Sequence, residues 1–484
     1  MDERNLTLLT DLYQLTMMNG YLESERADEI AVFDVFFRQH NMITYSLACG
    51  LEQVVNYVLN LKFGKEEIQY LKDLGIFNDK FLKYLKTFKF TGDIYAVPEG
   101  TVVFPGEPIL TVKAPIIQAQ LIETAILNMM NFQTLIATKA AKICRAAQGG
   151  AVMEFGLRRA QAPDAGIYGA RAAVIGGCSS TSNVYAGKEF DIPVSGTLAH
   201  SWVMNYPDEL TAFMEYAKIY PDNALLLVDT YDTIKSGIPN AIKVFDYLKE
   251  KGYKPKGIRL DSGDLAYLSK IARQMLDEAG HQDAKICASG DLDEQLILSL
   301  KHQGAKIDTW GVGTKLITSA DMPALGGVYK LVAVIDEKGN SIPKIKVSDN
   351  PIKITNPGFK NFYRVYDKAT GKAQADCIYL RSEAPVDCEK PLVLTHPINR
   401  WKSTTYENYE VKSLQQDIIK NGKLVYKLPT LKEIKAYAQK ELDSFWEEYK
   451  RIDSPHVYKV DLSNELYELK EKMLEEIRSR KISN

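Results

Sequence analysis

The chain has 484 residues, of which 45% are hydrophobic and 25% charged, and its formal net charge is −2. This length predicts two or three domains, and the composition is that of a folded globular protein rather than a disordered or fibrous one. Acidic and basic residues are interspersed without a basic tail or stripe, which argues against a nucleic-acid partner. An anionic small substrate would therefore have to be held by local charge.

Residues 1–5 are charged and lack the apolar stretch of a secretory signal. The most apolar long segment, 116–143, predicts a half-buried helix rather than a membrane span, because polar residues interrupt it, among them Gln118, Gln120, Glu123, Asn128 and Asn131. Six scattered cysteines without a Cys-x-x-Cys pair indicate neither a disulfide framework nor a zinc site. These features predict a cytoplasmic protein without a membrane partner.

An N-terminal α+β domain is predicted over residues 1–125, with a small β-module at 92–115 (GDIYAVPEGTVVFPGEPILTVKAP). Short β-branched runs alternate there with Pro-Glu-Gly and Pro-Gly-Glu turns. The module resembles the hammerhead of carrier domains that hold biotin or lipoate. Those carriers present a lysine at a hairpin tip, whereas Lys113 lies at the end of a strand-like run. We therefore predict a structural module rather than a carrier.

The pattern changes in the segment 126–340, where strand-length apolar runs end at Phe155, Gly196, Asp229, Asp261, Gly290 and Gly313. Helical stretches separate most of these runs. Strand and helix in alternation predict a parallel α/β architecture, and the absence of a Gly-x-Gly-x-x-Gly turn favours a barrel over a Rossmann sheet. Residues 341–484 are predicted to form a third, C-terminal α+β domain. It contains a helix after a capping box at residues 430–433 and a charge-rich last helix.

Functional groups of α/β barrels collect in the loops that follow the strands. Those positions contain arginines, one histidine, carboxylates and four glycine-bearing turns, in the segments 154–159, 196–201, 259–264, 289–291 and 311–315. Glycines let backbone amides approach phosphate oxygens, arginines bind phosphate bidentately, and aspartates can hold Mg²⁺ bridged to a pyrophosphate. Each cluster alone could be a turn, a core residue or a salt bridge. Five of them at consecutive strand ends favour a site for a polyphosphorylated substrate.

These clusters resemble the nicotinate phosphoribosyltransferases, a family of type II phosphoribosyltransferases. The resemblance rests on Thr10-Asp-Leu-Tyr13-Gln-Leu-Thr-Met17, Phe155-Gly-x-Arg158-Arg159, Gly196-Thr-x-Ala-His200, Arg259-x-Asp-Ser-Gly-Asp264 and Gly311-Val-Gly-Thr314, in the family's order. It covers about residues 7–335. It implies an irregular (β/α) barrel and an enzyme that condenses nicotinate with 5-phosphoribosyl 1-pyrophosphate to nicotinate mononucleotide and pyrophosphate. This reaction is the first step of NAD synthesis from nicotinate.

The resemblance also implies roles for single residues. His200 would be phosphorylated by ATP as co-substrate and would couple its hydrolysis to the condensation. Nicotinate would be bound by Tyr13 from a partner subunit of a homodimer, Phe155, Thr197 and Arg259. The phosphoribosyl pyrophosphate would be bound by Arg158, Ser262, Gly263, Ser289, Gly290, Gly313 and Thr314. Asp261, also a candidate catalytic residue, and Asp264 are candidates for Mg²⁺ or ribose contacts.

Other functions stay open. The nicotinamide phosphoribosyltransferases use an acidic residue near the pyridine ring, and segment 176–185 contains no carboxylate, which favours nicotinate. The related quinolinate enzymes are typically much shorter. A non-catalytic relative that acts as a binding module is disfavoured by the intact His200, Arg259 and Asp261. An unrelated aldolase-like barrel would need a Schiff-base lysine at a strand end, for which Lys315 is the candidate.

Overall fold

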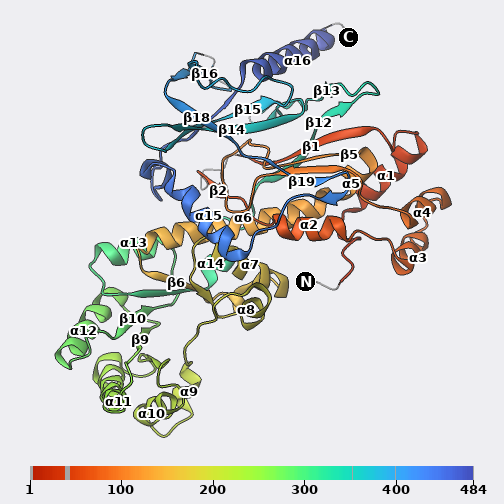
Figure 1. The fold of residues 1–484 in the computed structure, drawn as a ribbon. Helices are drawn as coiled ribbons and strands as arrows, with labels where there is room; N and C mark the ends of the chain where they lie inside the picture. The colour runs from red at the N-terminus through yellow and green to blue at the C-terminus, as the bar shows by residue number, and fades with distance from the viewer. Residues whose placement is uncertain (1–3, 39–43, 351–352, 398, 400, 483–484) are drawn as a thin grey trace. The chain divides into compact units, whose positions relative to one another are not determined.

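The computed structural model describes residues 4–38, 44–350, 353–397, 399 and 401–482 (Figure 1). The chain divides into two compact units. The first combines Met1–Leu135 with Ala324–Asn484, and the second is Ile136–Pro323. This division differs from the predicted three consecutive domains, because the two ends of the chain fold together.

A seven-stranded sheet in the first unit joins the two ends of the chain. Its strand order is β13-β12-β1-β5-β3-β19-β20. Strand β12 (Gly327–Ile335), expected in the barrel segment, pairs antiparallel with β1 (Ile30–Phe37). Strand β19 (Gln416–Lys420) pairs with β3 (Asp93–Ala96) of the β-module. The remaining strands are β5 (Leu110–Pro115), β13 (Ser341–Pro343) and β20 (Lys423–Leu424).

The predicted β-module at 92–115 is present as strands, but it does not form a separate sheet. Strands β3 and β5 are neighbours in the large sheet, whereas β4 (Val102–Val103) pairs with β2 (Ser46–Leu47). Its two turns contain Gly100 and Gly106 at φ 87° and 88°, in the left-handed region that favours glycine. The module is thus an integral part of the first unit's core.

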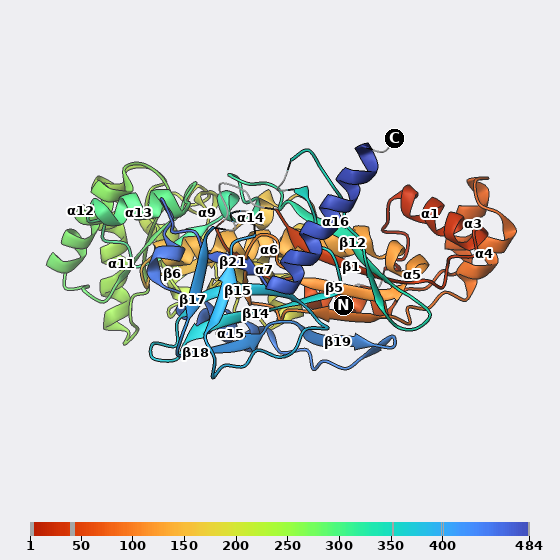
Figure 2. The same cartoon turned by 90° about the horizontal axis from the view of Figure 1, so that it is seen from above.

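The C-terminal residues add a second sheet to this unit, in the order β17-β16-β21-β15-β14-β18 (Figure 2). Helix α15 (Leu431–Asp443) begins at the predicted capping box, in which Thr430 and Glu433 bond each other's backbone amides. The strands are β14 (Lys360–Asp367), β15 (Ala373–Leu380), β16 (Leu392–Thr395), β17 (Ser403–Tyr406), β18 (Tyr409–Ser413) and β21 (Lys459–Leu462). The other helices are α1 (Leu12–Glu23), α2 (Leu51–Leu59), α3 (Lys65–Asp73), α4 (Asp79–Lys86), α5 (Ile116–Leu121), α6 (Glu123–Ala146) and α16 (Asn464–Ile482).

The second unit is built on parallel strands in the order β7-β6-β11-β10-β9-β8. Strands β6, β8, β9, β10 and β11 coincide with five of the predicted runs. The sixth, which ends at Gly196, forms only a single parallel bridge between Val194 and Thr181 of β7. The last strand, β11, pairs with the first, β6, as in a barrel. Among the strands of this unit, no ladder joins the Val194 segment to β8, so the barrel is irregular.

The bounds of the strands are β6 (Ala151–Glu154), β7 (Ser180–Thr181), β8 (Leu225–Leu227), β9 (Gly257–Leu260), β10 (Lys285–Ala288) and β11 (Thr309–Val312). The helices are α7 (Pro163–Ile175), α8 (Val184–Phe190), α9 (His200–Met204), α10 (Glu209–Ile219), α11 (Ile238–Glu250), α12 (Leu265–Glu278), α13 (Glu294–His302) and α14 (Thr314–Ile317). Within the described residues, no helix has both the length and the apolarity that crossing a membrane requires.

A buried charge network ties the β-module to the C-terminal residues in the first unit. The fully buried guanidinium of Arg364 bonds both oxygens of Asp376 at 2.9 and 2.7 Å, Glu441 at 2.8 Å and the Val102 carbonyl at 2.6 Å. Glu107 of the module lies beside Asp376. Burial, followed by the charge of Asp376, raises the pKa of Glu107 well above its usual value. This shift favours the neutral form of Glu107 beside the Asp376 carboxylate.

Glu107 and Arg364 should differ sharply in their contribution to stability. We expect Arg364→Met to lower the free energy of unfolding by about 3–5 kcal/mol, because two buried carboxylates lose their counter-charge. Glu107→Gln keeps a neutral side chain and should cost less than about 1 kcal/mol. Because the folded-state pKa of Glu107 is raised, wild-type stability is lost as pH rises toward that pKa, and the glutamine escapes this loss. Thermal unfolding should be measured at about pH 5 and about pH 8. The stability of Glu107→Gln relative to wild type should be greater at the higher pH. If Glu107→Gln lowered the free energy of unfolding as much as Arg364→Met does, the raised pKa assigned to Glu107 would be wrong.

Candidate functional site

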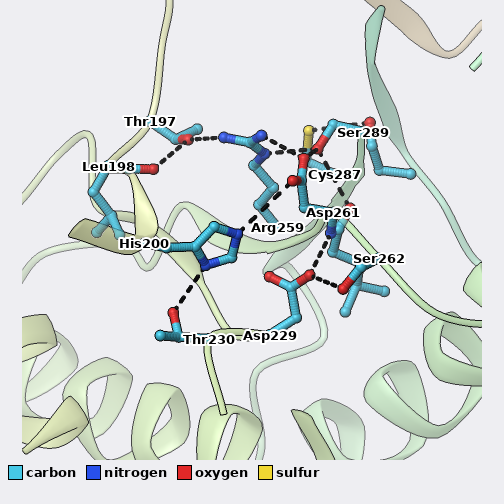
Figure 3. Close-up of polar contacts among 12 residues, drawn as sticks. Thr197, Leu198, His200, Asp229, Thr230, Arg259, Asp261, Ser262, Cys287 and Ser289 are labelled. Carbon is cyan, nitrogen blue, oxygen red and sulfur yellow. Dashed lines mark hydrogen bonds and ion pairs between the residues drawn. The ribbon is translucent and has the colours of Figure 1, made fainter. Parts of the chain in front are cut away.

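The predicted strand-end residues of the second unit meet around the guanidinium of Arg259, the third residue of β9 (Figure 3). Its Nη1 donates to Thr197 Oγ1 at 2.7 Å, its Nη2 to Asp261 Oδ1 at 2.5 Å and its Nε to Ser289 Oγ at 2.7 Å. The side chain is only 17% exposed. A guanidinium has five N–H donors, so two of them stay available to a bound anion.

Asp261 directs its two carboxylate oxygens to different partners. Oδ1 accepts hydrogen bonds from Arg259 and Ser289, and Oδ2 lies 3.8 Å from His200 Nε2. Burial alone would raise the pKa of Asp261, but the Ser289 hydrogen bond and the Arg259 charge outweigh it and hold the pKa below its usual value. Asp261 is therefore a carboxylate at neutral pH, and one of its oxygens faces the side of the site where His200 lies.

His200 is the first residue of α9, and its ring lies between Thr230 and Asp261 (Figure 3). Nδ1 is 3.1 Å from Thr230 Oγ1. The side chain is 41% exposed, so a ligand can reach the ring. The Thr230 contact fixes the orientation of the imidazole and leaves Nε2 on the side of Asp261.

Asp229 positions the loop that carries Asp261, a role that the sequence analysis missed. It follows β8, and its Oδ2 accepts the Asp261 backbone N–H at 3.1 Å and the Ser262 hydroxyl at 2.6 Å. Its Oδ1 is buried and has no hydrogen-bond partner in the described part of the chain. The only signal in the sequence was its place at the end of an apolar run, which it shares with Asp261. Thr230, the partner of His200, follows Asp229 directly and was not predicted from the sequence either.

Glycines pack the strand-end loops closely together. A Cβ on Gly311 would lie 2.7 and 2.8 Å from two ring carbons of Phe155, so the absence of a side chain there lets the ring lie against the β11 backbone. Gly290 has φ 93°, and a Cβ there would collide with the Asp261 carbonyl. A Cβ built on Gly313 would lie 3.2 Å from the carbonyl oxygen of Phe155. These glycines therefore bring Phe155, Asp261 and the β10 and β11 loops into contact.

Glu154 supports the turn that follows Phe155. It is completely buried, and its two oxygens accept hydrogen bonds from the Gly156 N–H and the Thr181 hydroxyl. Burial raises the pKa of Glu154, although both hydrogen bonds oppose the shift. Segment 176–185 itself contains no carboxylate, yet the fold brings this one to Thr181. Its two oxygens are already occupied.

Comparison with known proteins identifies the family to which this site belongs. The nicotinate phosphoribosyltransferase family model matches residues 151–374, its N-terminal domain model 8–131 and its C-terminal domain model 359–470. A nicotinate phosphoribosyltransferase of Bacillus subtilis is 49% identical over 479 residues, which cover 98% of this chain and 96% of the relative. One of Caenorhabditis elegans is 37% identical, with 95% and 92% covered. The chain belongs to the nicotinate phosphoribosyltransferase family.

Solved structures agree with this assignment. The crystal structure of human nicotinic acid phosphoribosyltransferase has a TM-score of 0.83 and 30% identity, and the match covers 96% of this chain and all of that one. A nicotinate-nucleotide pyrophosphorylase of Pyrococcus furiosus, at 23% identity and a TM-score of 0.68, shares the fold. The predicted fold class and family are thus confirmed. The C-terminal residues, which carried no sharp motif, also belong to the family.

Several residues of the family motifs lie outside the Arg259 hydrogen-bond network. Arg158 is exposed in a 3-10 turn and forms no hydrogen bond or ion pair with another described residue. Asp264 is the N-cap of α12, and its Oδ1 accepts the Tyr267 N–H at 3.0 Å. Gly263 precedes it at φ 81°. Thr314 is the first residue of α14. The helix cap explains Asp264 structurally, and its metal role stays a prediction.

Tyr13 belongs to the first unit, whereas the other site residues belong to the second. It lies on α1, and 48% of it is exposed, although Leu15 and Met18 of the same helix are buried. Tyr13 is therefore not part of the core, although it shares a helix with core residues. Exposed Leu9, Leu12 and Met17 surround it in sequence. This part of the chain has an apolar surface that includes an available aromatic ring.

We expect Asp229 to act as a positioning residue for Asp261 and Ser262. Asp229→Ala should lower kcat/KM by about a hundredfold, because misplacing a catalytic group by about 1 Å has an effect of this size. Asp229→Asn retains an oxygen acceptor and should recover part of the loss. The side chain of Asp232, in the same loop, accepts from the backbone amides of Ile234 and Lys235 and from no other described residue. Asp232→Ala is the matched control and should leave kcat/KM within about threefold of wild type, apart from a cap loss of about 1 kcal/mol in stability. Equal kinetic losses in the two alanine variants would refute the positioning role.

Proposed function

We propose that this chain condenses nicotinate with 5-phosphoribosyl 1-pyrophosphate to nicotinate mononucleotide and pyrophosphate, as its family name implies. The observation that supports this most strongly is the Arg259 fork, held by Thr197, Asp261 and Ser289 with two N–H donors left over. A carboxylate, like a phosphate, can bind a guanidinium bidentately. Phe155 supplies an aromatic surface at the end of β6, where its ring lies against Gly311 of β11.

Binding of nicotinate would then use groups of different character. The carboxylate would bind Arg259 and the Thr197 hydroxyl, whose proton would turn away from the Leu198 carbonyl that now accepts it at 3.1 Å. The pyridine ring would stack on Phe155. Tyr13 of a partner subunit would cover the other face of the ring, which makes the active enzyme a homodimer with shared sites. The exposure of Tyr13 and its apolar surroundings support this proposal.

The phosphoribosyl pyrophosphate would lie along the glycine-bearing loops. Ser289 and Gly290 after β10, and Gly313 and Thr314 after β11, would bind the 5-phosphate. Ser262, Gly263 and the exposed Arg158 would bind the other phosphates. Mg²⁺ that enters with the pyrophosphate needs only one or two protein carboxylates. Asp261 fits this requirement through Oδ2, and no group of three or more potential metal-ligating side chains gathers among the described residues.

The reaction itself requires positioning and charge stabilisation. The bond between the ribose anomeric carbon and pyrophosphate breaks, and the pyrophosphate leaves with the electron pair. The pyridine nitrogen, which has no proton to lose at neutral pH, donates its lone pair to the same carbon. The Asp261 carboxylate would stabilise the positive charge that develops on the ribose. Arg259 would hold the ring nitrogen in line for attack.

His200 would couple ATP hydrolysis to this reaction. If Nδ1 carries the proton and donates it to Thr230, Nε2 has a free lone pair. Nε2 would attack the γ-phosphorus of ATP, the bond to the β-γ bridging oxygen would break, and ADP would leave. Water would later hydrolyse the phosphohistidine.

We propose a cytoplasmic location for this enzyme, since its six cysteines are free thiols.

The preference for the acidic base tests the proposed function. Wild type should convert nicotinate far better than nicotinamide or quinolinate, because two charge-assisted hydrogen bonds from Arg259 fit a single carboxylate. Arg259→Gln should lower kcat/KM for nicotinate by about tenfold to a hundredfold. The ratio of kcat/KM for nicotinate to that for nicotinamide should fall as a result. Pyrophosphate release with each base, and without base, measures this. Comparable turnover of nicotinate and nicotinamide by wild type would overturn the proposal.

A His200 variant separates phosphoryl transfer from condensation. His200→Ala should still form nicotinate mononucleotide slowly without ATP, but it should lose ATP hydrolysis and ATP stimulation. Wild type incubated with γ-labelled ATP should give an acid-labile, base-stable phosphoprotein. His302, exposed on α13 outside the site, provides the matched control, and His302→Ala should label normally. Equal labelling of His200→Ala would show that another residue accepts the phosphoryl group.

A further inference from the structure

A cavity lies entirely within the first unit and shares no residue with the site described above. Its volume is about 590 Å³, which is within the range of about 300–1,000 Å³ typical of small-molecule sites. Strand β5, the β12–β13 turn, the ends of β14 and β15 and helix α16 contribute to its wall. Figure 1 shows β12, β14, β15 and α16 gathered at the same end of this unit.

Two cationic side chains of this cavity share one aromatic ring. Lys113 Nζ lies 5.7 Å and Arg381 Cζ 4.9 Å from the centroid of Phe359. Arg381 also lies 4.3 Å from the centroid of Tyr95. Cation–π contacts orient these charges, and the carboxylates of Asp34 and Asp417 offset part of the Arg381 charge. Two positive groups are thus held on one side of the cavity.

Neither cation forms an ion pair with a carboxylate of the described residues. The neighbouring Lys360 differs, because its buried ammonium is 2.9 Å from Asp34. Asp336 follows Ile335, which lines the cavity. Its carboxylate accepts hydrogen bonds within its own turn, from the backbone amides of Lys338 and Asn340 and from the side-chain amide of Asn340. Asp93 lies opposite Lys113 in the β3–β5 ladder, but it accepts hydrogen bonds from Tyr95 and Asn421. Positive charge that is only partly offset in a partly buried space favours the binding of an anion.

Arg381 has donors that the protein does not use. Its Nε donates to the Lys360 carbonyl at 3.0 Å and its Nη2 to Gln415 Oε1 at 2.6 Å. Its Nη1 has no hydrogen-bond acceptor among the described residues. Burial lowers the pKa of Arg381, although nearby acidic groups partly oppose this. The guanidinium is therefore fixed at one edge and open at the other.

The rest of the cavity wall suits an organic molecule with polar groups. Ser341 and Ser382 provide hydroxyls, and Ile335, Leu380 and Leu469 provide apolar surface. We propose that this cavity binds a small organic phosphate of about nucleoside monophosphate size. Its phosphate lies between Lys113 and Arg381, and its organic part packs on Phe359 and the aliphatic side chains. Lys113, excluded above as a carrier lysine, thereby becomes a phosphate ligand.

Hydrogen–deuterium exchange with named probes tests this proposal at the level of segments. Adenosine 5′-monophosphate should protect residues 108–116, 336–343 and 377–384, and inorganic phosphate should protect the same segments more weakly. Adenosine, which lacks the charge, should not protect them. Protection of residues 257–264 and 286–292 reports the site around Arg259 separately. High salt should weaken the effect, because the contacts are ionic.

Matched lysine variants decide whether the two cations carry the binding. Lys113→Gln should weaken binding of adenosine 5′-monophosphate by about tenfold or more. Lys412 on β18 lies 5.5 Å from the Tyr437 ring and does not line the cavity, so Lys412→Gln should bind as wild type does. Arg381→Lys, which keeps the charge but not the fork, serves as a second variant with an expected loss of similar size. Absence of protection by both phosphate probes, equal protection by adenosine, or unchanged binding in Lys113→Gln would each overturn the proposal.

Discussion

The half-buried guanidinium of Arg259 is the constraint on which the site depends. Its three hydrogen-bond partners come from three segments: Thr197 precedes α9, Asp261 follows β9, and Ser289 follows β10. A buried charge needs its partners in place at the same time, so the strand pairing that fixes these loops also fixes the site. The parallel registers of β9 with β10 and of β10 with β11 therefore have a direct functional consequence.

Strand-end positions in the barrel were predictable from sequence because parallel strands present their carboxyl ends at one edge. Five predicted runs became strands, and Thr197, His200, Arg259, Asp261 and Ser289 do meet. Asp229 and the way in which the glycines pack were not predictable. The partners of Asp229 are a backbone N–H and a hydroxyl of another loop, and Gly311 makes room for a ring 156 positions away in sequence. Such contacts depend on the folded geometry and leave no local pattern.

The division into units was not predictable for a related reason. Pairing of β3 with β19 joins residues more than 300 positions apart, and no property of either strand specifies its partner. The Arg364 network shows the energetic side of this pairing. Arg364 bonds the Val102 carbonyl in the β-module as well as Asp376 and Glu441, so the C-terminal residues satisfy polar groups that the module could not satisfy alone. The two ends of the chain thus share one buried polar core.

Asp261 links the two proposed activities through a single carboxylate. Oδ1 holds the arginine that would bind nicotinate, and Oδ2 faces the imidazole that would accept a phosphoryl group. Charges on the two oxygens are not independent, because they belong to one delocalised group. A negative phosphoryl group on His200 would repel the Asp261 carboxylate and strengthen its interaction with Arg259. A positively charged imidazolium would attract the same carboxylate and weaken that interaction. Asp229 holds the Asp261 backbone while these charges change. Coupling between ATP hydrolysis and base binding would therefore require no large movement, only a redistribution of hydrogen bonds around one fixed carboxylate.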